Sequence, residues 1–323
     1  MSTTTSARVS RSWIPYAGLL VLFWGVWGAF SSAPTDRYGY PDGMVYVVWA
    51  IMMIIPAAVA LRGARFDRRR IAAVYGLLVG LTGAGGQLLL FKALTIGPAY
   101  LIFPLIALSP AITVLMATAL LRERIPRLAV VGVVAALVAV VLFSVSGGDG
   151  SATSGPWLIL AILVCVAWGV QAYFMRKAAT VGVNDATTFS WMTISGLLLV
   201  PVAIWMAGGL ALDAPWQAPG LAAVTQLLNA VGALFLVMAF SRGKASIVAP
   251  TTNALAPVLT VILSLVVYQT LPSVWAAIGI VLAIGGSTLM VYADEKRGEA
   301  AAANVTDPVP ARPDAGRQVG TRR

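Results

Sequence analysis

Long apolar segments separated by short polar connections run along most of the chain. Each is close to the roughly 20 residues with which an α-helix crosses a ~30 Å hydrocarbon layer. Uninterrupted apolar runs are typical of such helices, whereas barrel strands alternate apolar and polar positions. The pattern therefore predicts an all-α membrane protein with ten transmembrane helices, at 13–30, 43–61, 71–94, 99–121, 128–146, 156–175, 186–206, 219–240, 246–268 and 272–292.

Lysine and arginine alternate from one connection to the next. Two precede the first segment, five follow the second, three follow the fourth, and two each follow the sixth and the eighth. The other connections between segments contain only Arg37. Because positive charge is retained on the cytoplasmic side, the pattern predicts a multi-pass protein of the plasma (inner) membrane with both termini cytoplasmic.

A stretch of the first half recurs in the second. Residues 107–114 read Ala-Leu-Ser-Pro-Ala-Ile-Thr-Val, and residues 254–261 read Ala-Leu-Ala-Pro-Val-Leu-Thr-Val. Each copy contains five segments, an odd number, so the second must enter the membrane from the opposite face, as in many secondary transporters. The predicted units are an N-terminal stretch 1–12, a five-helix repeat 13–146, a second five-helix repeat 156–292 and a disordered cytoplasmic tail 293–323.

Composition narrows the function classes. Of 323 residues, 59% are hydrophobic and 11% charged, whereas a soluble domain has about 25% charged residues. The net charge of +10 lies in the connections, so no nucleic-acid partner is expected. With no histidine, a single Cys165 and no acidic residue inside a segment, we expect no metal, no cofactor and no enzyme active site.

Several short motifs, each weak alone, occur in register in both copies. In the first they are Trp24-Gly25, the turn at 93–99, the segment around Pro110, Arg122-Glu123-Arg124-Ile125 and Gly132; in the second they are Trp168, 239–245, Pro257 and Gly279. Together they resemble the EamA-like family of the drug/metabolite transporter superfamily. The resemblance implies a ten-helix inverted repeat with a central cavity lined by segments one to four and six to nine. It also implies transport, often export, of small metabolites or drug-like compounds.

The match has one departure. Glu123, after the fourth segment, has no acidic counterpart in the second copy, where Gln269 and Thr270 stand. If that carboxylate acts in gating, the two halves are not equivalent.

Polar and aromatic side chains deep in the segments are the candidate substrate contacts. Indole faces and amides suit neutral or zwitterionic organic solutes; alternatively, the amides bridge helices, at about 0.6 kcal/mol each. Lys92, the one ionisable side chain inside a segment, either snorkels outward or attracts a carboxylate. The candidates are Trp24, Trp27, Gln87, Lys92, Trp168, Gln171, Asn229 and Asn253.

Prolines inside the segments are candidate hinges. Each lacks an N–H and leaves the carbonyl four residues earlier without its helical partner, so it either kinks the helix beside a wet cavity or shapes packing. They are Pro56, Pro104, Pro110, Pro201, Pro250 and Pro257.

Two pairs of small residues share one spacing: Gly132 with Ala136, and Gly279 with Ala283. Such spacings permit close helix approach, either inside the chain or in a homodimer.

These features predict a secondary transporter that moves a small organic metabolite or drug-like solute, by efflux, through alternating access. Its expected partners are that solute and the lipid bilayer. The alternative is a membrane channel or a non-transporting scaffold.

Overall fold

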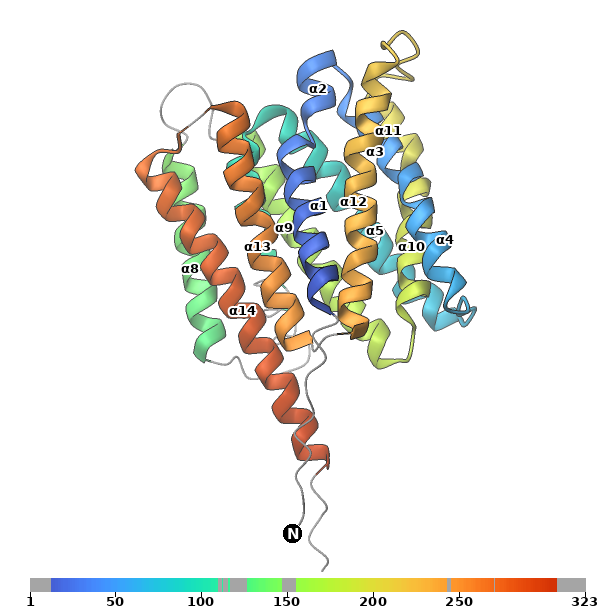
Figure 1. Cartoon of the computed structure of the whole chain (residues 1–323), viewed down its shortest axis with the longest axis vertical. Coiled ribbons are helices and arrows are strands. Elements are labelled where there is room, and N and C mark those ends of the chain that lie inside the picture. Colours follow the sequence, from blue (N-terminus) through green and yellow to red (C-terminus); the bar gives the residue numbers. More distant parts are fainter. Residues whose placement is uncertain are drawn as a thin grey trace, which may run out of the picture.

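The computed structural model is a bundle of helices (Figure 1). It describes residues 13–109, 112, 116, 127–146, 155–242, 245–269 and 271–306, and no strand occurs within them. The helices are α1 (Ile14–Phe30), α2 (Ala33–Tyr38), α3 (Asp42–Met52), α4 (Ile54–Arg62), α5 (Arg70–Ile96), α6 (Ala99–Ile106), α8 (Arg127–Ser146), α9 (Pro156–Thr180), α10 (Asp185–Leu198), α11 (Val200–Met206), α12 (Gln217–Arg242), α13 (Ala245–Tyr268) and α14 (Val274–Thr306).

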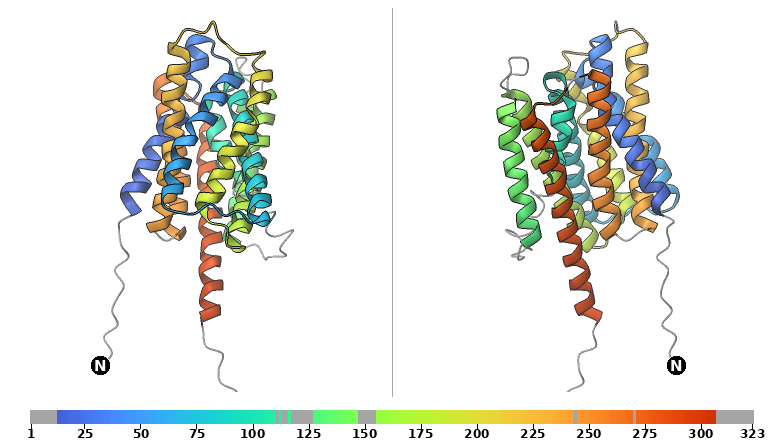
Figure 2. Two further views of the ribbon diagram at one scale, coloured as in Figure 1. Left: turned by 90° about the vertical axis from the view of Figure 1, so that its right-hand side faces the viewer. Right: turned by 60° about the vertical axis from the view of Figure 1, so that its left-hand side comes forward.

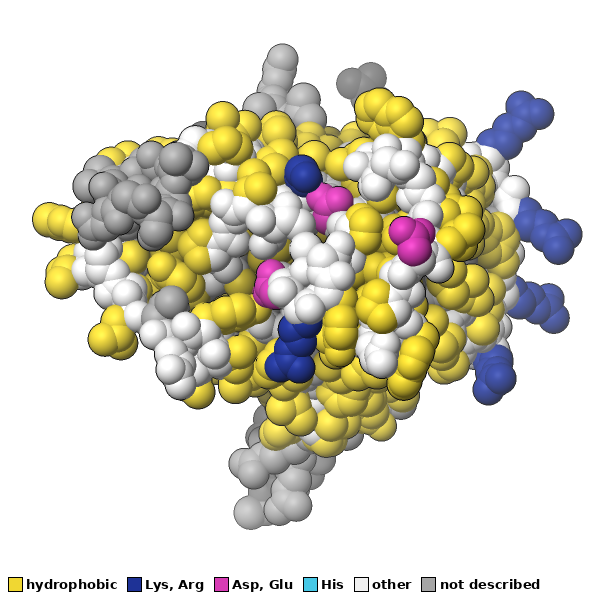
Figure 3. Space-filling model, turned by 90° about the horizontal axis from the view of Figure 1, so that it is seen from above, with side chains coloured by type: hydrophobic (Ala, Val, Ile, Leu, Met, Phe, Trp, Pro, Cys, Tyr) yellow, Lys and Arg dark blue, Asp and Glu magenta, His cyan; other side chains and the backbone are white. Residues whose placement is uncertain are grey.

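The surface and the helix lengths fit a multi-pass membrane protein. Six helices in the described part of the chain are long and apolar enough to cross a bilayer, and shorter apolar helices lie at Val130–Ala139, Leu255–Tyr268 and Val274–Met290. Large apolar side chains such as Val74, Leu137 and Val281 are more than half exposed. Seen from the end where α2 lies, hydrophobic side chains surround the bundle and few charged ones interrupt them (Figure 3).

The second segment of each predicted repeat is interrupted at an equivalent place. The first breaks at Met53, between α3 and α4, and the second at Leu199, between α10 and α11. Pro56 and Pro201 follow these breaks within the next turn, and each lacks the N–H that would bond to the carbonyl four residues earlier in a continuous helix. The interruptions therefore coincide with two of the candidate hinges.

The remaining prolines differ in their surroundings. Pro104 lies inside α6, and α13 runs through both Pro250 and Pro257 without a break. Pro110 lies outside the described residues, as does Glu123.

Helices from the two halves pack closely along their lengths. α1 packs against α12 and α13, and α5 packs against α9 and α10. The rings of Phe23 and Phe235 meet edge to face, with centroids 5.4 Å apart, while Trp27 is bonded to Gln226. Higher numbers on α1 thus meet lower numbers on α12, so these two helices are antiparallel (Figure 2).

Gly132 lies at the contact between α8 and α14, which form one edge of the bundle (Figure 1). A Cβ at Gly132 would stand 2.7 Å from the Gly286 carbonyl oxygen and 3.2 Å from the Met290 nitrogen. Of the two interpretations of the small-residue spacing, close packing inside the chain therefore accounts for this glycine. Ala283, from the second pair, is also fully buried.

The C-terminal segment differs from the expected disordered tail. α14 continues beyond residue 292 as far as Thr306, while residues 307–323 lie outside the described part. The extension is rich in alanine and contains Glu295, Lys296 and Glu299, which are strong helix formers. Lys296 also lies over the Tyr292 ring, 5.0 Å from its centroid. Local helix propensity thus outweighs the lack of apolar residues for packing.

Candidate functional site

A cavity of about 310 Å³ lies at the centre of the bundle, and both halves of the chain line it. Its walls come from α1, α3, α5, α6, α9, α10, α12 and α13. The volume falls at the small end of the range for ligand pockets, roughly 300–1,000 Å³. Seven residues singled out in the sequence line it together: Trp24, Trp27, Gln87, Trp168, Gln171, Asn229 and Pro257.

Two tryptophans join the halves in matching ways. Trp24 on α1 donates its indole N–H to the Asn229 carbonyl on α12, at 3.0 Å. Trp168 on α9 donates its indole N–H to the Gly83 carbonyl on α5, at 3.2 Å. The first helix of each predicted repeat is thereby bonded to the third helix of the other.

A glycine makes room for each of these two rings. A Cβ at Gly86 would stand 2.5 Å from Trp168 Nε1. A Cβ at Gly232 would likewise collide with the Trp24 ring. Gly86 and Gly232 each lie three residues after the residue whose carbonyl accepts the indole bond. The close approach therefore depends on the absence of a side chain there.

Other polar groups around the cavity divide into paired and unpaired. Trp27 Nε1 donates to Gln226 Oε1 at 3.1 Å, and Thr260 Oγ1 donates to the Gly25 carbonyl at 3.2 Å. The Gln87 amide nitrogen and the Trp49 indole nitrogen are buried without a hydrogen-bond partner. The lining thus contains two fully buried donors without a partner, in mainly apolar surroundings.

Lys92 does not line the cavity. Its ammonium nitrogen lies 3.4 Å from Asp42 Oδ2, and the Lys92 side chain is about half exposed. Asp42, just before the second predicted segment, is buried at the start of α3 and accepts the Gly43 N–H through Oδ1. The cation is therefore balanced within the first half of the chain. The side chains of Asn253 and Pro250 lie outside the described residues.

Replacing Lys92 by methionine is expected to lower thermal stability and leave solute selectivity unchanged. The substitution leaves the Asp42 carboxylate buried without its cation, and Asp42 Oδ2 has no hydrogen-bond partner. The midpoint of thermal unfolding in lipid nanodiscs measures the effect. Adding Asp42→Asn should restore much of the midpoint, because it removes the charge left alone; a changed solute preference in Lys92→Met would instead show that the lysine acts on the solute.

Sequence reasoning missed several lining residues, all apolar or weakly polar. They come from α3, the α3–α4 break, α6, α10 and α13, and stand in apolar runs where nothing distinguishes a cavity-facing position from a lipid-facing one. Two local signals were available: the proline near Met53 and, at Trp49, an indole inside a predicted segment. The missed residues include Trp49, Met53, Phe103, Met192 and Thr260.

Comparison with known families agrees with this architecture. The model of the EamA-like transporter family matches twice, at residues 11–145 and 155–292. The chain belongs to the EamA-like transporter family. The two matches divide this EamA-like protein close to the limits of the repeats expected from the sequence.

Individual relatives of this EamA-like protein add information on the repeat and the fold. The uncharacterized protein MJ1333.1 of Methanocaldococcus jannaschii is 28% identical over 135 residues, which are 41% of this chain and 94% of that protein. A relative this short has about the length of one repeat. A solved crystal structure is similar over 89% of this chain and 99% of its own, with a TM-score of 0.58 and 23% identity, which supports the fold alone.

Proposed function

We propose that this EamA-like protein is a secondary transporter that exports a small organic metabolite or drug-like solute by alternating access. The observation that carries the proposal is the central cavity, which both halves line and beside which the indoles of Trp24 and Trp168 join one half to the other. A site shared by two mobile halves is what a rocking mechanism requires. Export, as the direction, rests on the family resemblance.

The pattern of helix contacts supports ten spans in an inverted repeat. Exchanging the halves turns the α1–α12 contact into the α9–α5 contact, and the α3–α12 contact into the α10–α5 contact; all four are present. The α8–α14 contact matches itself under the same exchange, and the α3–α11 contact becomes the α10–α4 contact, which is also present. A pseudo-twofold axis in the membrane plane produces this set of pairs.

The proposed orientation places the start of α1 and the end of α14 in the cytoplasm. In two views these ends lie on the same side of the bundle (Figures 1 and 2). The positive-inside rule then assigns that side to the cytoplasm. Labelling of single cysteines from outside intact cells should reach residue 213 and not residue 68.

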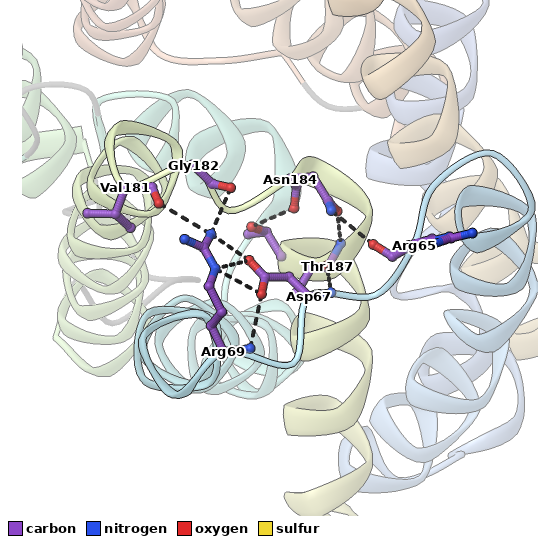
Figure 4. A network of polar contacts seen from close by, with 8 residues as sticks. Arg65, Asp67, Arg69, Val181, Gly182, Asn184 and Thr187 are labelled. Carbon is purple, nitrogen blue, oxygen red and sulfur yellow. Dashed lines mark hydrogen bonds and ion pairs between the residues drawn. The ribbon is translucent and has the colours of Figure 1, made fainter.

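A network of polar contacts joins the two halves at this end of the bundle (Figure 4). Arg69, just before α5, donates to the Gly182 carbonyl at 2.9 Å and to the Val181 carbonyl at 3.3 Å. Asn184, the N-cap of α10, donates to the Arg65 carbonyl at 3.0 Å. These bonds tie the α4–α5 connection to the α9–α10 connection, so the network is suited to keep this end closed.

An ion pair orients Arg69 within the network. Arg69 Nη2 lies 2.6 Å from Asp67 Oδ2, and the hydrogen bonds from Arg69 hold the pKa of Asp67 below its usual range. The backbone N–H of Asp67 donates to Thr187 Oγ1 at 2.8 Å, which ties this residue to α10. Because the pKa of the Asp67 carboxyl is lowered, the carboxylate stays ionised and paired with Arg69 at neutral pH. The pair breaks only as the pH falls through that pKa.

Arg69→Ala is expected to open this end of the bundle more often. A cysteine placed at Ala233 in the cavity, in a Cys165→Ala background, should then react roughly two- to fivefold faster with an impermeant thiol reagent added to inside-out vesicles. Arg65→Ala is the matched control, because the network uses only the backbone carbonyl of Arg65. Equal labelling in both variants would contradict a closing role for Arg69.

Counterflow in proteoliposomes tests the proposed function. Vesicles preloaded with unlabelled candidate solutes should accelerate the uptake of the labelled solute, because an alternating carrier returns faster when loaded. A channel, the alternative function, would equilibrate the label without this acceleration, and a scaffold would move none.

A further inference from the structure

We propose that the central cavity takes an uncharged, planar ligand that carries a hydrogen-bond acceptor, such as a ring bearing a carbonyl group. The inference rests on the proposed function for the identity of the site, and it specifies the class of solute.

The lining carries no charge to balance a charged ligand. None of the described residues that line the cavity is Asp, Glu, Lys or Arg. Lys92 lies outside the lining and is balanced by Asp42. A charge moved from water into an apolar site without a counter-charge loses its hydration and gains no equivalent interaction. The site therefore favours a ligand without net charge.

Three indoles in the lining already use their N–H groups, which leaves their rings for contact with a ligand. Trp24, Trp27 and Trp168 line the cavity, and each N–H already donates to a protein acceptor. These bonds also hold the rings in place across the two halves. Fixed ring faces favour stacked or edge-to-face contact with another flat ring, and a volume of about 310 Å³ suits a small one.

Two buried donors without a partner lie on neighbouring helices of the lining. Gln87 on α5 is 5% exposed and Trp49 on α3 is 4% exposed; both line the cavity, and Gln87 Nε2 and Trp49 Nε1 have no partner. A buried donor without a partner is unfavourable, so an acceptor supplied by the ligand is stabilising. The Gln87 amide turns easily about its terminal bond, which lets Nε2 reach an acceptor in the cavity.

Binding of five related benzenes to the full-length protein in lipid nanodiscs tests the charge and the acceptor separately. Benzamide and acetophenone are neutral and carry a carbonyl; ethylbenzene has no acceptor; benzoate is an anion and benzylamine a cation near neutral pH. Equilibrium dialysis should give dissociation constants at least about tenfold lower for the first two than for the two ions. Tighter or equal binding of either ion, or no binding by any of the five, would overturn the proposal.

Substitutions then locate the donors. Gln87→Leu and Trp49→Phe should each weaken acetophenone binding by roughly three- to tenfold and leave ethylbenzene binding unchanged. Trp157→Phe is the matched control, because Trp157 also has a buried, unpaired indole N–H but does not line the cavity. Equal losses for acetophenone and ethylbenzene would reject the donor role.

These measurements do not involve transport. A protein that binds as expected but fails in counterflow would refute the transporter proposal alone. One that transports but prefers an ion would refute the ligand class alone.

Discussion

Alanine at Trp24 or at Trp168 is expected to slow solute counterflow by at least about tenfold. Each substitution removes a ring face from the cavity and an indole bond between the halves, at 3.0 Å from Trp24 and 3.2 Å from Trp168. Truncating a large packed aromatic side chain costs about 3–5 kcal/mol of interaction energy, and every ~1.4 kcal/mol added to the transport barrier slows the rate tenfold. Initial rates in proteoliposomes with equal protein content measure the effect.

The two variants should behave alike, because the tryptophans occupy matching places in the two halves. Trp205→Ala is the control: Trp205 is 79% exposed on α11 and lines no part of the cavity, so its loss should leave counterflow unchanged. Phenylalanine at position 24 or 168 should retain more activity than alanine, since it keeps a ring face. Full activity in either alanine variant would show that the indole bridge is not needed for transport.

Leucine at Gly132 is expected to destabilise the folded protein by roughly 1–3 kcal/mol. Even a Cβ there would stand 2.7 Å from the Gly286 carbonyl oxygen, and the backbone of α14 cannot give way without moving the helix. The longer side chain should separate α8 from α14 and lower the thermal unfolding midpoint in nanodiscs.

Gly285→Leu is the matched control for this effect. Gly285 lies beside Gly286 on α14, but a Cβ at Gly285 meets nothing within 4 Å. Leucine also has a higher helix propensity than glycine, so this control should not lose stability. If both variants melted alike, the contact between α8 and α14 would not be the cause.

The residues that line the cavity were only partly predictable. Trp24, Trp168, Gln87 and Asn229 stood out because indoles and amides are rare in the middle of an apolar segment. Met53 and Phe103 did not, because an apolar residue in a span fits lipid, a neighbouring helix or a cavity equally well.

Lys92 was conspicuous in the sequence, but its ion-pair partner could not be predicted. The sequence singled it out correctly as an unusual charge, but its partner, Asp42, lies fifty residues earlier and just before a predicted segment. Pairing depends on how α3 and α5 lie against each other, and hydropathy carries no information about that. Of the two interpretations of Lys92, the cavity cation does not match the structure: the side chain is half exposed, lies outside the lining and is paired with Asp42.

The amino-acid sequence by itself determined the membrane setting, the apolar helices, the twofold recurrence and the rare polar positions, because each is a property of one segment or of two compared segments. Tertiary structure decided which of those positions share a cavity, which indole donors are already used and which glycines face another backbone. Those outcomes depend on the rotation and contact of helices about 200 residues apart, such as α1 and α12. No local pattern encodes them, since a helix has the same hydropathy whichever face it turns inward.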